Sequence, residues 1–272
     1  MLGSLIGIFL TSTGIIIGAD AVLLGSTVPP PAQVDKTCQL GLRSAGTLQG
    51  WYGENLYLYQ RFHEVCRELA RSSKLQSLEA QADRLAKKLE QTYREHTGIQ
   101  PPKAANLPPP SNEHVAYVAV AGYERETPLV TVREIRWRKN GRGNWHVTTE
   151  RVSRLSAHGC GARFIGEDGV ANVLLDKSAH FKEEKRRPEV LAGSLANQLY
   201  KDDDCLDSSF SIDEAKALYK IAVRLTIDHG EQFAIEAGAV GGRLRLLTIP
   251  PVGSIKQEVI DPEQYVADRL AS

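Results

Sequence analysis

The chain has 272 residues, of which 42% are hydrophobic and 24% are charged, and these proportions exclude a chain that is disordered throughout. A chain of this length can bury a substantial core, in one large domain or in two small ones. Because 33 basic residues balance 33 acidic residues, overall charge gives no reason to expect nucleic acid or a membrane surface as a partner, and we expect function to come from a local site.

The first 24 residues are predicted to form two apolar strands joined by a turn at residues 11–14. They are rich in Leu and Ile without helical spacing, and Gly14 and Gly18 would weaken a helix. An apolar beginning is also typical of a signal peptide, but no Lys or Arg precedes this run and Asp20 lies inside it. Paired strands are therefore favoured, and an exported protein that loses about 25 residues as a signal is kept as an alternative.

The next segments continue with strands and then change to helices. Two short strands are expected over residues 37–42 and 45–48, after a proline run. From Trp51 the apolar spacing becomes helical and predicts two helices, the first carrying Leu58 and Phe62 and the second ending near Gly98. A linker at residues 101–112 separates these helices from strands expected over residues 114–121, 129–137 and 145–155.

The last third of the chain alternates helices and strands. Helices are expected over residues 170–181 and 190–200, and a third begins at a capping box of Ser211 and Glu214 and ends at Gly230. Strands over residues 233–239 and 244–249 follow, with a short helix near residues 263–270. This order predicts an α+β fold, in which two stacked antiparallel sheets are covered on their outer faces by helices.

The four cysteines lie far apart in the sequence and form no metal-ligand spacing: Cys38, Cys66, Cys160 and Cys205. They are interpreted as thiols in a reducing compartment, with a disulfide or a reactive thiol as the alternative. The acidic tract at residues 202–209 is interpreted as a solvated surface loop, with a metal site as the alternative. We therefore expect no cofactor, no metal and a cytoplasmic location.

Three segments of the opening stretch resemble, in order, the active-site segments of a proteasome-type subunit of the N-terminal-nucleophile (Ntn) hydrolase superfamily. They are Gly14-Ile15-Ile16-Ile17-Gly18-Ala19-Asp20, then Lys36, then Gly46-Thr47-Leu48-Gln49-Gly50. Counting back by the family's intervals, from Asp20 and from Lys36 separately, reaches Ser4 in both cases. The resemblance covers most of residues 3–250 and is strongest in the first 70.

The resemblance implies a four-layer αββα sandwich and a specific chemistry. Self-cleavage of the bond between Gly3 and Ser4 would expose Ser4 as an N-terminal nucleophile, with its own α-amine as the proton acceptor. Lys36 would lower the local proton affinity, Asp20 would hold Lys36, and the N–H of Gly50 would bind the oxyanion.

Two later landmarks are also implied by the resemblance. Gly159-Cys160-Gly161 resembles the family's Gly-Ser-Gly turn, and Asp228, placed just after the capped helix, matches the distal acid that supports the nucleophile's amine. The implied domain covers residues 1–250 with an extended segment at 180–210, and residues 251–272 form a tail.

The resemblance implies a peptidase subunit that acts on unfolded polypeptides or peptides within a homo- or hetero-oligomeric ring, with an ATPase unfoldase as a candidate partner. Two departures from the family pattern keep a second interpretation open. Ser4 replaces the usual threonine, and Val22 and Leu23 stand where an arginine commonly follows the acid. The alternative is a structural ring subunit without catalytic activity.

Overall fold

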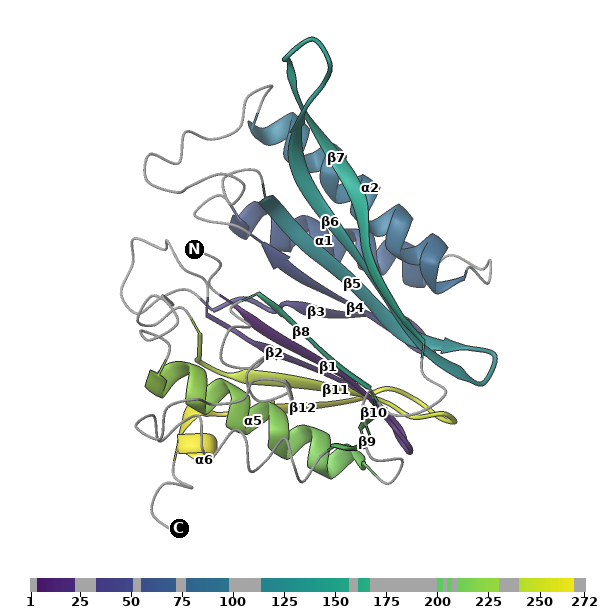
Figure 1. The fold of residues 1–272 in the computed structure, drawn as a ribbon, viewed down its shortest axis with the longest axis vertical. Helices are drawn as coiled ribbons and strands as arrows, with labels where there is room; N and C mark the ends of the chain where they lie inside the picture. Colours follow the sequence, from purple (N-terminus) through teal and green to yellow (C-terminus); the bar gives the residue numbers. More distant parts are fainter. Residues whose placement is uncertain are drawn as a thin grey trace.

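The computed structural model describes residues 4–22, 33–50, 55–71, 77–97, 114–156, 161–166, 200–202, 205–206, 210–229 and 240–266. Within these ranges the chain is α+β, with two five-stranded antiparallel sheets and four helices. Figure 1 shows the two sheets with helices beside each of them. This arrangement is compatible with a sandwich.

The first sheet has the strand order β12-β11-β2-β1-β8. Its strands are β1 (Leu5–Thr11), β2 (Gly14–Asp20), β8 (Gly161–Gly166), β11 (Leu244–Ile249) and β12 (Lys256–Ile260). Every residue of β1 and of β2 is buried, because this central pair is covered on both faces. That double burial explains why the two strands are continuous apolar runs and do not alternate with polar residues.

The second sheet has the order β3-β4-β5-β6-β7, in which each strand pairs with the next one along the chain. The strands are β3 (Thr37–Gly41), β4 (Ser44–Gly50), β5 (His114–Glu124), β6 (Thr127–Lys139) and β7 (Trp145–Ser156). Between β4 and β5 the chain forms the helices α1 (Asn55–Ala70) and α2 (Leu78–Thr97). A separate pair of short strands consists of β9 (Tyr200–Asp202) and β10 (Cys205–Leu206).

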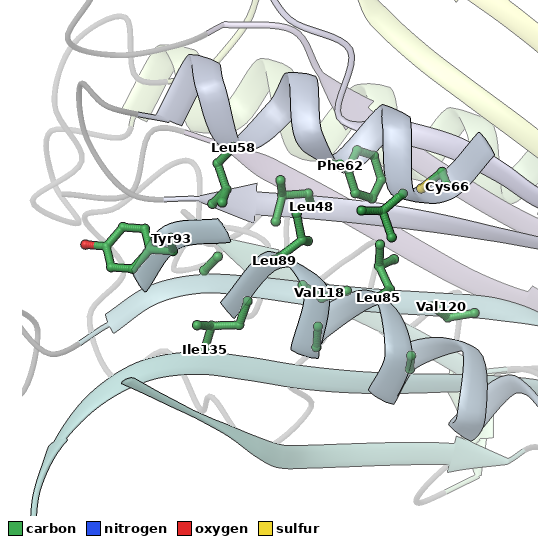
Figure 2. Close-up of a cluster of buried hydrophobic side chains, with 14 of the residues drawn as sticks. Leu48, Leu58, Phe62, Cys66, Leu85, Leu89, Tyr93, Val118, Val120 and Ile135 are labelled. Carbon is green, nitrogen blue, oxygen red and sulfur yellow. The ribbon is translucent and has the colours of Figure 1, made fainter. Parts of the chain in front are cut away.

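Three hydrophobic clusters hold these elements together. One lies between the two sheets and contains Ile8 and Ile17 of the first sheet and Ala119 and Val132 of the second. Another joins the second sheet to α1 and α2, and Figure 2 shows its side chains from both helices and from β4, β5 and β6. The last joins the first sheet to α5 (Ile212–His229) and α6 (Pro262–Val266).

The expected α+β class is confirmed, the expected strands and helices between residues 5 and 156 are present, and the capping box is present. Ser211 N–H donates to Glu214 Oε2 at 2.7 Å, and Glu214 N–H donates to Ser211 Oγ at 3.3 Å. None of the described helices is both long and apolar enough to cross a membrane.

Several expectations about the last third were wrong or are outside the described residues. Strands β8, β10 and β12 were not predicted. Strand β10 lies in the acidic tract that was interpreted as a loop, and β12 lies in the segment that was assigned to a tail. Tyr200, expected to end a helix, begins β9. The predicted helix over 170–181, most of that over 190–200, the strand over 233–239 and the linker lie outside the described residues.

Candidate active site

Ser4 lies immediately before β1 and is 1% exposed. Strand β8 approaches it closely, since Leu5 is paired with Gly166. Gly166 has φ of +101°, and a Cβ placed on it would come within 2.0 Å of the Ser4 carbonyl oxygen. Only glycine combines that backbone conformation with such a close approach. The end of β8 therefore helps to fix the position of Ser4.

Asp20 is the last residue of β2, and the antiparallel register places it beside the start of β1. Its Oδ1 accepts the N–H of Leu5 at 2.8 Å, and its Oδ2 accepts the N–H of Gly241 at 3.4 Å. The Asp20 carboxylate is thus hydrogen-bonded to the backbone of Leu5, the residue that follows Ser4. The N–H groups of Leu5 and Gly241 together orient the carboxylate.

Lys36 reaches this position from the other sheet, one residue before β3. Its Nζ lies 2.5 Å from Ser4 Oγ, 3.1 Å from Asp20 Oδ1 and 2.6 Å from the carbonyl oxygen of Val22. The side chains of Lys36 and Asp20 are both 0% exposed. Three acceptors match the three N–H donors of an ammonium group. The structure therefore brings Ser4, Asp20 and Lys36 into one buried cluster.

Burial has opposite effects on the two charged groups. It lowers the pKa of Lys36, against the attraction of Asp20, which raises that pKa. It raises the pKa of Asp20, while Lys36 and the Leu5 N–H oppose the increase. Burial thus favours an uncharged amine at Lys36, and an uncharged amine has a lone pair that can accept the proton of the Ser4 hydroxyl.

The segment before Lys36 is fixed by Asp35. The Oδ1 of Asp35 accepts hydrogen bonds from both the N–H and the hydroxyl of Thr37, each at 3.1 Å. Its Oδ2 is paired with Arg245 of β11, and its carbonyl oxygen lies 2.8 Å from Nε2 of His63 in α1. These contacts connect Lys36 to the first sheet and to α1. A cavity of about 230 Å³ lies beside this segment and is bordered by Asp20 and Lys36.

Gly50 lies at the end of β4, and its N–H has a partner that the sequence analysis missed. It donates to the hydroxyl of Tyr59 in α1 at 3.2 Å. The same hydroxyl is hydrogen-bonded to the Ser4 side chain, and Tyr59 is 2% exposed. The only signal in the sequence is that Tyr59 precedes Phe62 by one helical turn on the apolar face of α1, which suggests a core residue.

Of the distal landmarks, the described residues include Asp228 and Gly161. Asp228 was expected after the helix, but it lies within the last turn of α5 and is exposed. Gly3 and the residues 159–160 are outside the described residues, and Gly161 begins β8.

Cys38 and Cys66 have free thiols, while Cys160 is outside the described residues and Cys205 is in β10. A hydrogen bond with Cys66, together with the nearby His63, lowers the pKa of Cys38 to about 6. Within the described ranges, His, Cys, Asp and Glu side chains form no group of three or more that could hold a metal ion.

The chain matches no known family profile and no curated protein. The functional argument therefore depends on the geometry of the cluster. That geometry consists of a serine before a strand, a buried lysine within hydrogen-bond distance of its hydroxyl, and a carboxylate that contacts both the lysine and the next backbone N–H.

Proposed function

We propose that this protein is a peptidase subunit of the Ntn-hydrolase type, with Ser4 as its nucleophile. The contact that carries the proposal is the 2.5 Å separation between Lys36 Nζ and Ser4 Oγ in a site shielded from solvent. A buried lysine next to a serine hydroxyl is an arrangement that activates a nucleophile. Asp20 supports it by holding both Lys36 and the backbone N–H of Leu5.

The first reaction in this proposal is self-cleavage between Gly3 and Ser4. Ser4 Oγ forms a bond to the Gly3 carbonyl carbon while Lys36 takes the hydroxyl proton. The bond from that carbon to the Ser4 nitrogen then breaks, and the nitrogen takes up a proton to become a free amine. Water hydrolyses the resulting ester, so that Gly3 keeps a carboxylate and Ser4 Oγ regains its proton.

The second reaction is hydrolysis of a peptide substrate. The new α-amine of Ser4 accepts the hydroxyl proton as Oγ attacks the scissile carbonyl, since the pKa of a chain-terminal amine is ordinarily about 8. The amine leaving group departs with a proton, and water then hydrolyses the acyl-enzyme. A donor to the oxyanion is typically worth about 3 kcal/mol of transition-state stabilisation.

The proposal includes the finer architecture that the resemblance implies. The layered α+β arrangement is taken as the αββα sandwich of Ntn hydrolases, assembled into a homo- or hetero-oligomeric ring in the cytoplasm. Its substrates are unfolded polypeptides or peptides, delivered by an ATPase unfoldase. The signal-peptide alternative is disfavoured because its removal would delete β1 and β2, the central strands of the first sheet, together with Asp20.

Intact-mass analysis of the purified full chain tests the proposal directly. We expect the wild-type protein to begin at Ser4, and Ser4→Ala to keep the residues before position 4. Ser4→Thr retains a hydroxyl and is expected to be processed, which shows that the hydroxyl and not the size of the side chain is required. A wild-type chain that still begins at Met1 or Leu2 after assembly would overturn the mechanism.

A structural subunit without catalytic activity is the second candidate, and one contact favours it. The N–H of Gly50, expected to bind an oxyanion, is already bonded to the Tyr59 hydroxyl. The candidate is supported if Ser4→Ala changes neither the assembly of the protein nor the peptidase output of cells that produce it. A loss of peptidase output with normal assembly would exclude it.

A further inference from the structure

Two glycines lie side by side in the central strands of the first sheet. Gly7 of β1 and Gly18 of β2 are direct cross-strand partners, and every residue of these two strands is buried. A glycine inside a strand weakens it and often marks a place where another group comes close. A pair of glycines at the centre of a buried sheet therefore indicates a close approach.

The group that approaches is the ring of Tyr219 in α5. A Cβ placed on Gly7 would come within 2.7 Å of this ring, and a Cβ on Gly18 within 2.5 Å, whereas carbon atoms in contact are about 3.5–4.0 Å apart. Tyr219 is 0% exposed, in the cluster that joins the first sheet to α5. Figure 1 shows α5 along that sheet, on the side away from the second sheet. The glycine pair thus lets the ring lie directly against the strands.

This approach brings the Tyr219 hydroxyl to the backbone beside the nucleophile. The O–H donates to the carbonyl oxygen of Leu5 at 2.8 Å. The N–H of Leu5 donates to Asp20 Oδ1, also at 2.8 Å. Both backbone polar groups of Leu5 are therefore held by buried side chains, one from the candidate site and one from the outer helix. Because the Leu5 nitrogen is bonded to the carbonyl carbon of Ser4, this double attachment orients Ser4 as well.

The Tyr219 hydroxyl keeps the proton that it donates. Burial raises the pKa of Tyr219 well above that of a free tyrosine, and the nearby Asp20 charge raises it further. The phenol is therefore neutral at the pH values at which Lys36 changes its charge. Its hydrogen bond to Leu5 is present on both sides of that change.

We propose that Tyr219 is a positioning residue, which fixes the backbone at Leu5 and so holds Ser4 Oγ within reach of Lys36. This inference rests on the proposed function. Tyr219 acts through the Leu5 carbonyl and not on the reacting atoms. The site then depends on the helix layer outside the first sheet as well as on the contact between the two sheets.

The test compares Tyr219→Phe with Thr226→Val in the full chain. Thr226 is also buried in α5, and its Oγ1 donates to the carbonyl oxygen of Ala222 at 2.7 Å. Each substitution thus removes one buried hydroxyl that donates to a backbone carbonyl, but the Thr226 bond stays within α5. The rate of Gly3–Ser4 cleavage is measured by intact mass under conditions in which both variants are folded. We expect Tyr219→Phe to be slower by roughly tenfold or more, since small displacements of reacting groups reduce rates steeply, and Thr226→Val to match the wild type.

Two tyrosine analogues at position 219 separate positioning from packing. 4-Aminophenylalanine keeps the ring and has an N–H donor in place of the O–H, so we expect it to be processed faster than Tyr219→Phe. 4-Fluorophenylalanine fills the space of the oxygen but has no proton to donate, so we expect it to be processed as slowly as Tyr219→Phe. It also takes the place of Tyr219→Phe in the comparison if that variant does not fold. A wild-type rate with 4-fluorophenylalanine would show that the ring only packs, and would overturn the inference.

The remaining outcomes separate this inference from the proposed function. If the wild type is processed and Tyr219→Phe is processed at the same rate, the inference is overturned and the Ser4 mechanism stands. Equal slowing in Thr226→Val also overturns the inference, because the loss then follows from a weakened α5. If the wild type is not processed, the proposed function is overturned and this inference with it.

Discussion

Lys36 can accept the Ser4 proton only in its neutral form. Burial lowers the pKa of Lys36, so the neutral form is reached at a lower pH than for an exposed lysine. Protonated Lys36 predominates below this pKa and neutral Lys36 above it. We therefore expect the rate of Gly3–Ser4 cleavage to increase with pH and to level off above the lysine pKa. Initial rates measured across a pH series provide the test. In Lys36→Arg the guanidinium stays charged, so we expect slow processing at every pH. A wild-type rate that falls as pH rises would contradict this role.

The buried pair of Asp20 and Lys36 also contributes to stability, because each charge offsets the cost of burying the other. At a pH below the pKa of Lys36, where the amine is protonated, Lys36→Met leaves Asp20 buried without its cation, and removing one partner of a buried pair costs about 3–5 kcal/mol. We expect the double variant Asp20→Asn with Lys36→Met to regain most of that loss, since no charge is then left unpaired. Urea unfolding of the three proteins measures the difference. A double variant as unstable as Lys36→Met would show that the cost comes from packing and not from charge.

At the scale of elements, β8 closes one side of the site through Gly166. We expect Gly166→Ala to displace Ser4, because an added Cβ would approach the Ser4 carbonyl oxygen to 2.0 Å in a backbone with φ of +101°. Gly143→Ala is the matched control, since Gly143 has φ of +78° and nothing lies within 4 Å of the added Cβ. Each variant should lose about 1 kcal/mol or more from backbone strain. Only Gly166→Ala should also slow processing, as intact mass would show, and equal processing in both variants would contradict the prediction.

The elements that the sequence predicted are those with one strong local signal. The capping box of α5 and the apolar spacing of α1 and α2 depend on neighbours in the chain, and the structure contains all three helices. Strand β12 was missed because four of its five residues are exposed, so an edge strand carries little apolar pattern. Strand β8 is six residues that begin and end with glycine, a composition that also fits a loop.

The residues of the candidate site also differ in how far the sequence could predict them. The resemblance to the Ntn-hydrolase family placed Ser4, Asp20 and Lys36 in one site, and the structure brings the three residues into one cluster. Tyr59 was missed because its partners are Gly50 and Ser4, which only the stacking of α1 on β4 and of one sheet on the other brings near. Asp228 was placed by its order in the chain, which gave no information about its exposure.

At the scale of the whole molecule, the site exists only when the two sheets are stacked. Ser4 precedes β1 and Asp20 ends β2 in the first sheet. Lys36 precedes β3 and Gly50 ends β4 in the second sheet, and Tyr59 lies in α1, which covers that sheet. The cluster between the sheets therefore controls the distance from Lys36 to Ser4. A defect in this cluster should affect chemistry more than an equal defect in an outer cluster.

We therefore expect Ile17→Ala and Leu78→Ala to differ in processing although both remove a buried side chain. Ile17 lies between the sheets, while Leu78 begins α2 in the outer cluster, where its N–H donates to Glu124 at the end of β5 far from Gly50. Each substitution should cost about 2–5 kcal/mol in urea unfolding. Under conditions in which both are folded, Ile17→Ala should be processed roughly tenfold or more slowly, because small displacements of reacting groups reduce rates steeply. Equal rates in the two variants would show that Ser4 and Lys36 keep their geometry without a well-packed interface between the sheets.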